Sequence, residues 1–178
     1  MSQSLWDFAG VDALDIANAI FGGTVNRLAA FQSLETVLDG QACSVLRLCD
    51  RNFRIADAPT LPQHFHALPN ALLNQPTQSF TWMRQFDWIS RTVYSVDKLA
   101  LLCEIATVRS PHRLDNLPNG CAVPAQIKSI PVLLWHHSPQ GKPTIECHFA
   151  SKDAQKLSQN LPTALSTTVT PNICSGKL

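Results

Sequence analysis

The sequence predicts an α+β fold, in which helices pack on a mixed, mainly antiparallel sheet. Three observations indicate it. Two segments of alternating apolar residues, 43–58 and 129–149, each contain a turn and are typical of strand hairpins. Segments with apolar residues at helical spacing flank and separate them. Hydrophobic residues make up 45% of the chain and charged residues 15%, which provides enough apolar surface for a packed core.

The first 40 residues are expected to contain two helices. A first helix over residues 3–21 presents one apolar stripe: Leu5, Phe8, Ala9, Ala13, Ile16, Ala17 and Ile20. Gly22-Gly23 ends it, Thr24 can cap a second helix, and Gly40 is a typical C-terminal signal for that second helix. This stripe is too apolar to face water, so the first helix is expected either to dimerise or to pack on the chain's own sheet.

The middle of the chain predicts short elements separated by loops. Residues 43–50 and 53–58 alternate as two strands joined at Asp50-Arg51-Asn52. Residues 59–78 contain four prolines and are expected to be loop with one short helical turn. A helix is expected over 80–90, a strand over 91–96 and a helix over 99–107. Residues 109–124 are expected to be loop, because three prolines and a glycine interrupt them.

The stretch 128–150 predicts the centre of the sheet. Two strands, 129–136 and 144–149, are joined by the turn Ser138-Pro139-Gln140-Gly141. The first strand is apolar on both faces, so Trp135 is expected to be buried. Asp153 lies in the first turn of a last helix that Pro162 ends or kinks, and the tail from Ser166 is expected to be loose.

Three phrases in this order resemble the GAF domain, a sensory module related in shape to PAS. Residues 34–65 resemble its opening strand hairpin and short helix, 78–96 its middle helix and strand, and 125–149 its closing hairpin. The resemblance implies a GAF-like domain over 34–165, between a helical element at 1–33 and a tail at 166–178. It implies a regulatory or signalling module that binds a small molecule or a protein, and a homodimer through flanking helices. Lys142, Glu146 and His148 depart from the family's closing hairpin, and no specific ligand carries over.

Large aromatic and arginine side chains are the candidate ligand-binding residues. A pocket needs apolar walls and a few polar anchors, and arginine is the usual anchor for an anionic group. The candidates are Arg47, Trp82, Trp88, Arg91, Tyr94 and Trp135. The alternative interpretation is that the aromatic residues are core and that the arginines lie on the exposed face of the sheet.

Histidine and cysteine suggest a second class of function, a small metal-binding or thiol enzyme. If the hairpin register pairs His136-His137 with Cys147-His148, alternate residues could converge on one face, but neighbours on a strand point to opposite faces, so at most one residue of each pair can join. His64 and His66 flank a phenylalanine in the first long loop. Cys103 and Cys147 each precede a polar residue whose side chain diverges from the thiol. We therefore assign no catalytic residue, metal ligand or cofactor.

The composition and the first residues of the chain indicate which classes of partner are disfavoured and which cellular compartment is expected. Fourteen basic against thirteen acidic residues, without a basic block, disfavour nucleic acid and membrane surfaces as the main partner. The start has no basic, apolar leader, so we expect a cytoplasmic protein with reduced cysteines. The function expected from the sequence is a stand-alone, non-catalytic sensory module for a small molecule or a protein. The alternatives are the metal or thiol enzyme and a ligand-free interaction protein that associates through its first helix.

Overall fold

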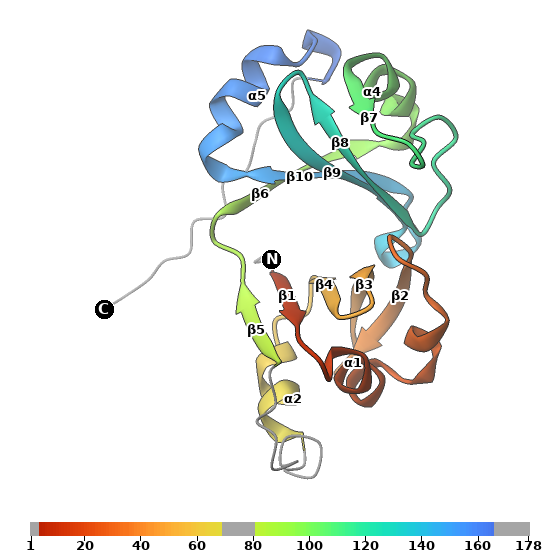
Figure 1. Ribbon diagram of the computed structural model, residues 1–178, viewed down its shortest axis with the longest axis vertical. Coiled ribbons are helices and arrows are strands. Elements are labelled where there is room, and N and C mark those ends of the chain that lie inside the picture. The colour runs from red at the N-terminus through yellow and green to blue at the C-terminus, as the bar shows by residue number, and fades with distance from the viewer. Residues whose placement is uncertain (1–3, 69–80, 166–178) are drawn as a thin grey trace. The chain divides into compact units, whose positions relative to one another are not determined.

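The computed structural model describes residues 4–68 and 81–165 and confirms the α+β class. The chain divides into two compact units, Met1–Phe86 and Asp87–Leu178 (Figure 1). Among the described residues, each unit contains a five-stranded antiparallel sheet and two α-helices. The expected boundary after residue 33 falls inside the first unit. The expected tail at 166–178 and the second half of the expected loop, residues 69–78, lie outside the described residues.

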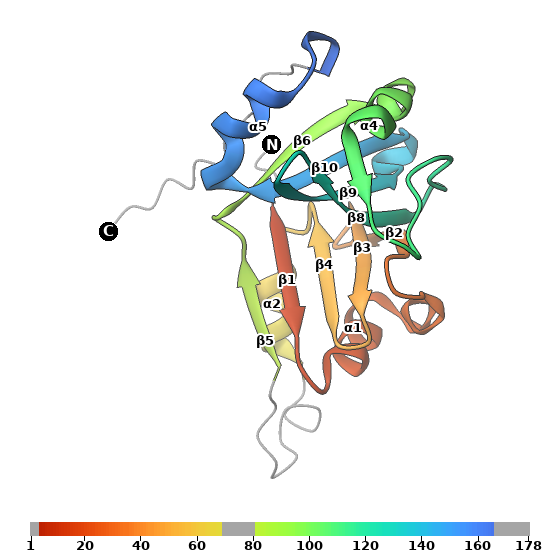
Figure 2. The same cartoon turned by 45° about the horizontal axis from the view of Figure 1, so that its top comes forward.

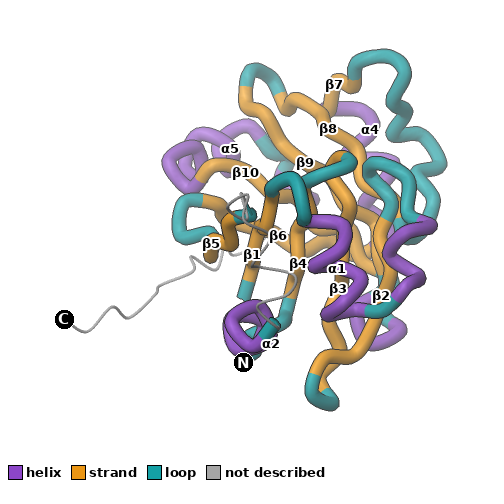
Figure 3. Tube along the Cα trace, turned by 60° about the horizontal axis from the view of Figure 1, so that its bottom comes forward, coloured by secondary structure: helices purple, strands orange, loops and turns teal. Residues whose placement is uncertain are grey.

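The sheet of the first unit has the strand order β2-β3-β4-β1-β5. Its strands are β1 (Leu5–Ala9), β2 (Ser33–Leu38), β3 (Gln41–Cys49), β4 (Asn52–Ala56) and β5 (Trp82–Gln85). Figure 2 shows β1, β4 and β3 side by side. The helices α1 (Ala13–Phe21) and α2 (Leu61–Ala67), purple in Figure 3, contribute to the core of this unit. In that core Phe8 and Phe53 stack with ring centres 5.3 Å apart.

The expected helix over residues 3–21 is wrong in its first half. Residues Leu5–Ala9 form β1, which pairs with β4 on one side and with β5 on the other. Leu5 and Phe8 have the spacing of a helical stripe, but in the strand they point to opposite faces, and both are buried. The second half is the helix α1, whose Ile16 and Ala17 pack in the core of this unit. The helix therefore packs on its own sheet.

The expected second helix, over residues 24–40, is also wrong. A short 3₁₀ helix, Gly23–Arg27, is followed by the strand β2. Leu38 pairs with Gln41, and the two residues between them, Asp39 and Gly40, have φ angles of 52° and 76°. Two consecutive positive φ angles identify a two-residue hairpin turn, for which Asp-Gly is a preferred sequence. Gly40 thus turns a hairpin and does not end a helix.

The described part of the expected helix at 80–90, residues 81–90, contains two strand segments and no helix. Trp82–Gln85 form β5, and Ile89 begins β6 (Ile89–Ser95), which extends the expected strand at 91–96. Strong β propensity of tryptophan, phenylalanine and isoleucine agrees with this result. The expected helix at 99–107 ends at Ile105 as α4 (Leu99–Ile105). The expected loop at 109–124 ends earlier, because β8 begins at Cys121.

The sheet of the second unit has the order β6-β10-β9-β8-β7. Its other strands are β7 (Ala106–Val108), β8 (Cys121–Ile127), β9 (Ile130–His137) and β10 (Thr144–Ala150). The expected central hairpin is confirmed as β9 and β10, and Trp135 is fully buried as predicted. The helices α4 and α5 (Ala154–Asn160) place Leu102 and Leu157 in the core on one face. That core receives Ile145, Cys147 and Phe149 from β10.

Candidate functional site

A polar cluster lies on the face of the second sheet that points away from this core. Strand alternation directs Glu146 and His148 of β10 to that face, because Ile145 and Cys147 enter the core. The register then sets their neighbours. Arg91 of β6 lies opposite His148, and Trp135 of β9 lies opposite Glu146. Three adjacent strands therefore bring the cluster together.

The carboxylate of Glu146 is the centre of the cluster. Nη1 of Arg91 is 3.3 Å from both carboxylate oxygens. Nε2 of His148 is 2.8 Å from Oε2, and Nε2 of His137 is 3.2 Å from Oε1. All four side chains are buried. A buried carboxylate is stable only when its oxygens are well paired, and both oxygens of Glu146 have such partners.

Trp135 holds the two imidazoles in position. Its indole stacks on the ring of His137, with centres 3.9 Å apart and planes 13° from parallel. His148 meets the same indole edge-on at 5.9 Å. These two arrangements are the favoured geometries for aromatic rings, so the indole fixes the plane of each imidazole relative to Glu146.

The electrostatics of the cluster keep Glu146 ionised. Burial alone would raise the pKa of this carboxyl, but hydrogen bonds from His137 and His148 and the charge of Arg91 outweigh burial. Its pKa consequently lies below the usual value of 4.5. An ionised carboxylate whose oxygens already accept these bonds is a poor general base.

Two of the other histidines make hydrogen bonds within the protein, and burial protects four of the cysteine thiols. Nδ1 of His136 is 2.7 Å from the carbonyl oxygen of Leu117, and Nε2 of His64 is 2.7 Å from Oδ2 of Asp39. Burial raises the pKa of the Cys43 thiol to about 11 and that of Cys147 to about 12, so both thiols are protonated near neutral pH. Burial also raises the pKa of Cys103 and Cys121. Within residues 4–68 and 81–165, no group of three or more His, Cys, Asp or Glu side chains is suited to hold a metal ion.

The six residues predicted to bind a ligand do not form one site. Arg91 and Trp135 meet in the cluster around Glu146. Tyr94 is buried on the opposite face of the sheet, in the core under the helices. Trp88 is 38% exposed. Sequence reasoning missed the pairing role of Glu146, although a charged residue inside an otherwise apolar hairpin is a signal for it.

The two remaining candidates belong to the first unit. The guanidinium of Arg47 in β3 donates to the carbonyl oxygen of Leu28 at 2.7 Å and to the carboxylate of Asp50 at 3.0 Å. These bonds hold the strand to neighbouring residues, so the role of Arg47 is structural. Trp82 is 50% exposed on the edge strand β5. Neither residue lines the cavity of the second unit described below.

The first unit has its own buried ion pair. Asp7 of β1 lies opposite Arg54 of β4, with Oδ1 and Nε 3.1 Å apart. The guanidinium also lies 5.0 Å from the ring centre of Phe86. Burial raises the pKa of Asp7 to about 6 despite the charge of Arg54 and its hydrogen bond.

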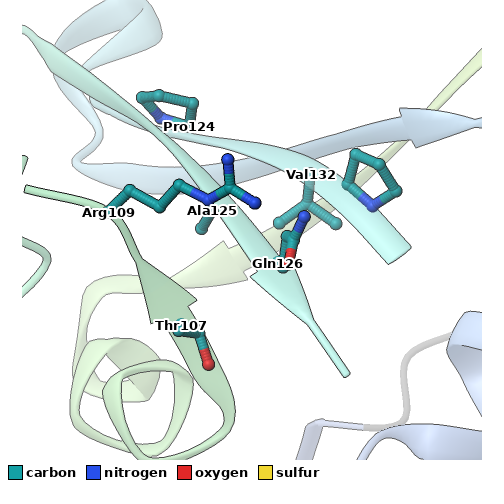
Figure 4. A pocket seen from close by; sticks show the side chains of 7 residues that line it. Thr107, Arg109, Pro124, Ala125, Gln126 and Val132 are labelled. Atoms are coloured by element: carbon teal, nitrogen blue, oxygen red, sulfur yellow. The ribbon is translucent and has the colours of Figure 1, made fainter. Parts of the chain in front are cut away.

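A cavity of about 240 Å³ opens at the other end of the second sheet (Figure 4). Its wall is formed by residues of β7, β8 and β9 and of the segment after β7, namely Thr107, Arg109, Pro124, Ala125, Gln126, Pro131 and Val132. The floor is mostly apolar. Three polar side chains, those of Thr107, Arg109 and Gln126, stand around it.

Comparison with known proteins identifies the fold. No family model matches the sequence, and no curated protein matches it. The structure is similar to the glycine cleavage system aminomethyltransferase T from Bartonella henselae, with a TM-score of 0.62 and 14% identity. That match covers 89% of this chain and 43% of the aminomethyltransferase, so this chain spans less than half of it.

A second solved structure is similar over nearly its whole chain. It is the heterotetrameric sarcosine oxidase from Corynebacterium sp. U-96, crystallised in complex with pyrrole 2-carboxylate. The TM-score is 0.60, the identity is 17%, and the match covers 95% of this chain and 84% of that chain. At these identities the two likenesses establish a shared fold.

Within the described residues, no helix is long and apolar enough to cross a membrane.

Proposed function

We propose that this protein is a non-catalytic binding module whose main partner is another protein chain, in the manner of an accessory subunit. One observation carries the proposal: the chain corresponds to 84% of one chain of a heterotetrameric enzyme. It therefore matches a nearly complete polypeptide that works inside a multi-chain assembly. The use of this fold as a whole chain in such an assembly suggests the same use here by analogy of fold.

The chemistry of the described residues supports a binding role over a catalytic one. The carboxylate of Glu146 is ionised and occupied by Arg91 and two histidines, so its bonds stabilise the fold. The thiols with raised pKa values are unsuited to nucleophilic attack. A thiol or metal enzyme finds no comparable support in this geometry.

Exposed apolar side chains on edge strands support a protein partner. Trp82 on β5 is 50% exposed, and Val93 on β6 is 41% exposed. Trp88, immediately before β6, is 38% exposed. Aromatic side chains dominate the binding energy of protein interfaces, and edge strands offer unpaired backbone groups for a partner.

To test this, the chain is purified from its own source, and a second protein that accompanies it in fixed proportion is identified. The affinity of the chain for that protein is then measured. We expect Trp82→Ala or Trp88→Ala to weaken that complex by about tenfold or more, since aromatic anchors carry most interface energy. Lys152→Ala, at an exposed position, is the control and should leave the affinity unchanged. The proposal fails if no partner of fixed proportion exists, or if both tryptophan variants bind as the unchanged protein does.

The sensory role implied by the GAF resemblance stays a prediction that no comparison here tests. A small-molecule signal, a homodimer and a cytoplasmic location also stay predictions. A cytoplasmic location agrees with the reduced state expected for the cysteines. A self-associating chain and a chain bound to a different protein are distinguished by the mass of the complex. The affinity measurement above therefore begins with that mass.

A further inference from the structure

We propose that the cavity beside β7 binds a small monocarboxylate with a compact apolar body. This inference is independent of the protein partner proposed above. It rests on three polar side chains that share one face of the sheet, on the absence of hydrogen bonds and ion pairs between them and the described residues, and on the apolar floor between them. All seven lining residues belong to the second unit.

The strand register explains why the three polar side chains converge. Thr107 of β7 lies opposite Gln126 of β8, which lies opposite Pro131 of β9. Arg109 follows Thr107 by two residues, so continued strand alternation places it on the same face, beside Pro124. Figure 4 shows the Arg109 side chain extending across the sheet toward Ala125 and Pro124.

The three polar side chains of the cavity make no stabilising polar contact with the described part of the chain. Among residues 4–68 and 81–165, the side chains of Thr107, Arg109 and Gln126 make no hydrogen bond or ion pair. The other arginines discussed above, at 47, 54 and 91, each pair with a carboxylate. Arg109 is therefore a cation available to a ligand.

The chemistry of the wall selects the class of ligand. A guanidinium matches the two oxygens of a carboxylate in a planar, two-bonded arrangement. The amide of Gln126 and the hydroxyl of Thr107 add donors at the rim. Pro124 and Pro131, which alternate onto the same face as Gln126, offer hydrocarbon surface that favours an apolar body over a hydrated anion. A volume of about 240 Å³ lies below the range of drug-sized sites, so the ligand is small.

The test uses benzoate as the probe, titrated into the full chain and followed by amide chemical shifts. We expect saturable shifts at residues 106–109 and 124–132, with a dissociation constant of about 1 mM or lower. Benzamide, which has the same shape without the charge, should bind about tenfold more weakly. Inorganic phosphate, which has charge without an apolar body, should also bind more weakly.

Variants locate the site. Arg109→Gln should weaken benzoate binding by about tenfold, and Arg109→Lys should lose part of it, because lysine lacks the planar fork. Arg113→Gln, an exposed position outside the cavity, is the matched control. Thermal unfolding of each variant confirms that it folds. The proposal is overturned by the absence of saturable shifts up to about 10 mM benzoate, by an unchanged affinity in Arg109→Gln, or by phosphate binding as tightly as benzoate.

Discussion

Glu146 and Arg91 lie on adjacent strands, and Nη1 of the arginine is 3.3 Å from both oxygens of the carboxylate. Both side chains are at least nine-tenths buried. The pair thus joins β6 to β10 on the face of the sheet that points away from the helix-covered core. Because both side chains are buried, removing either charge leaves the other without a partner, which is strongly unfavourable.

Replacing Glu146 with glutamine should destabilise the protein by about 3 kcal/mol or more, because Arg91 is left buried without a counter-charge. Denaturant unfolding of the two proteins measures this difference. Glu104→Gln, at an exposed position in α4, is the control and should change the free energy of unfolding by less than about 0.5 kcal/mol. Equal midpoints for Glu146→Gln and the unchanged protein would show that the ion pair does not stabilise the fold.

The same carboxylate should make the protein acid-sensitive. The pKa of Glu146 is lower in the folded chain than its usual value of 4.5. Its stabilising contribution is therefore complete above that usual value and is lost as the pH falls further, through the folded pKa. The free energy of unfolding should fall more steeply below pH 4.5 in the unchanged protein than in Glu146→Gln. Parallel curves would contradict this assignment.

Asp7 should have the opposite effect on the pH profile. Its folded pKa of about 6 is higher than the usual 3.8. The stabilisation that protonated Asp7 contributes to folding is fully present below pH 3.8. It is lost as the pH rises through about 6, and the free energy of unfolding falls by an amount on the order of 3 kcal/mol. Asp7→Asn should remove this loss, whereas Asp115→Asn, at an exposed position, should retain it. A pH profile of Asp7→Asn identical to that of the unchanged protein would mean that Asp7 ionises normally.

Trp135→Ala should cost about 3–5 kcal/mol, since it empties a fully buried site and removes the surface on which His137 stacks. Thermal and denaturant unfolding both report it. Trp82→Ala is the matched control, because half of that side chain is exposed, and it should cost markedly less. Similar losses for the two variants would mean that the buried indole adds nothing specific to the core.

Removal of residues 2–23 should unfold the first unit. β1 lies between β4 and β5, so its removal leaves one side of β4 unpaired, takes from β5 its partner among the described strands, and is accompanied by the loss of α1. We expect loss of cooperative unfolding for this unit in calorimetry, and aggregation in sedimentation, because unpaired strand edges associate. A shortened chain that stays folded, and changes only from dimer to monomer, would instead support the dimer predicted from the apolar stripe.

The central hairpin could be predicted from sequence because alternation and a proline-glycine turn both indicate strands at 129–149. The N-terminal segment could not, because Leu5 and Phe8 fit a helical stripe and a buried strand equally well. Only pairing with β4 and β5, which are distant in sequence, decides between them. The site follows the same logic. Arg91 and Trp135 were identifiable as large side chains on strands, but their meeting at Glu146 depends on the register of three strands, which no local pattern specifies.

The most direct test of the proposed function is native mass spectrometry of the protein purified from its own source at its natural level. A binding subunit should appear in one dominant species, whose mass equals whole numbers of this 19.6 kDa chain and of a different chain. Dissociation in the gas phase should release both chains in that proportion. A dominant species containing only this chain, as a monomer or as a homodimer, would contradict the proposal.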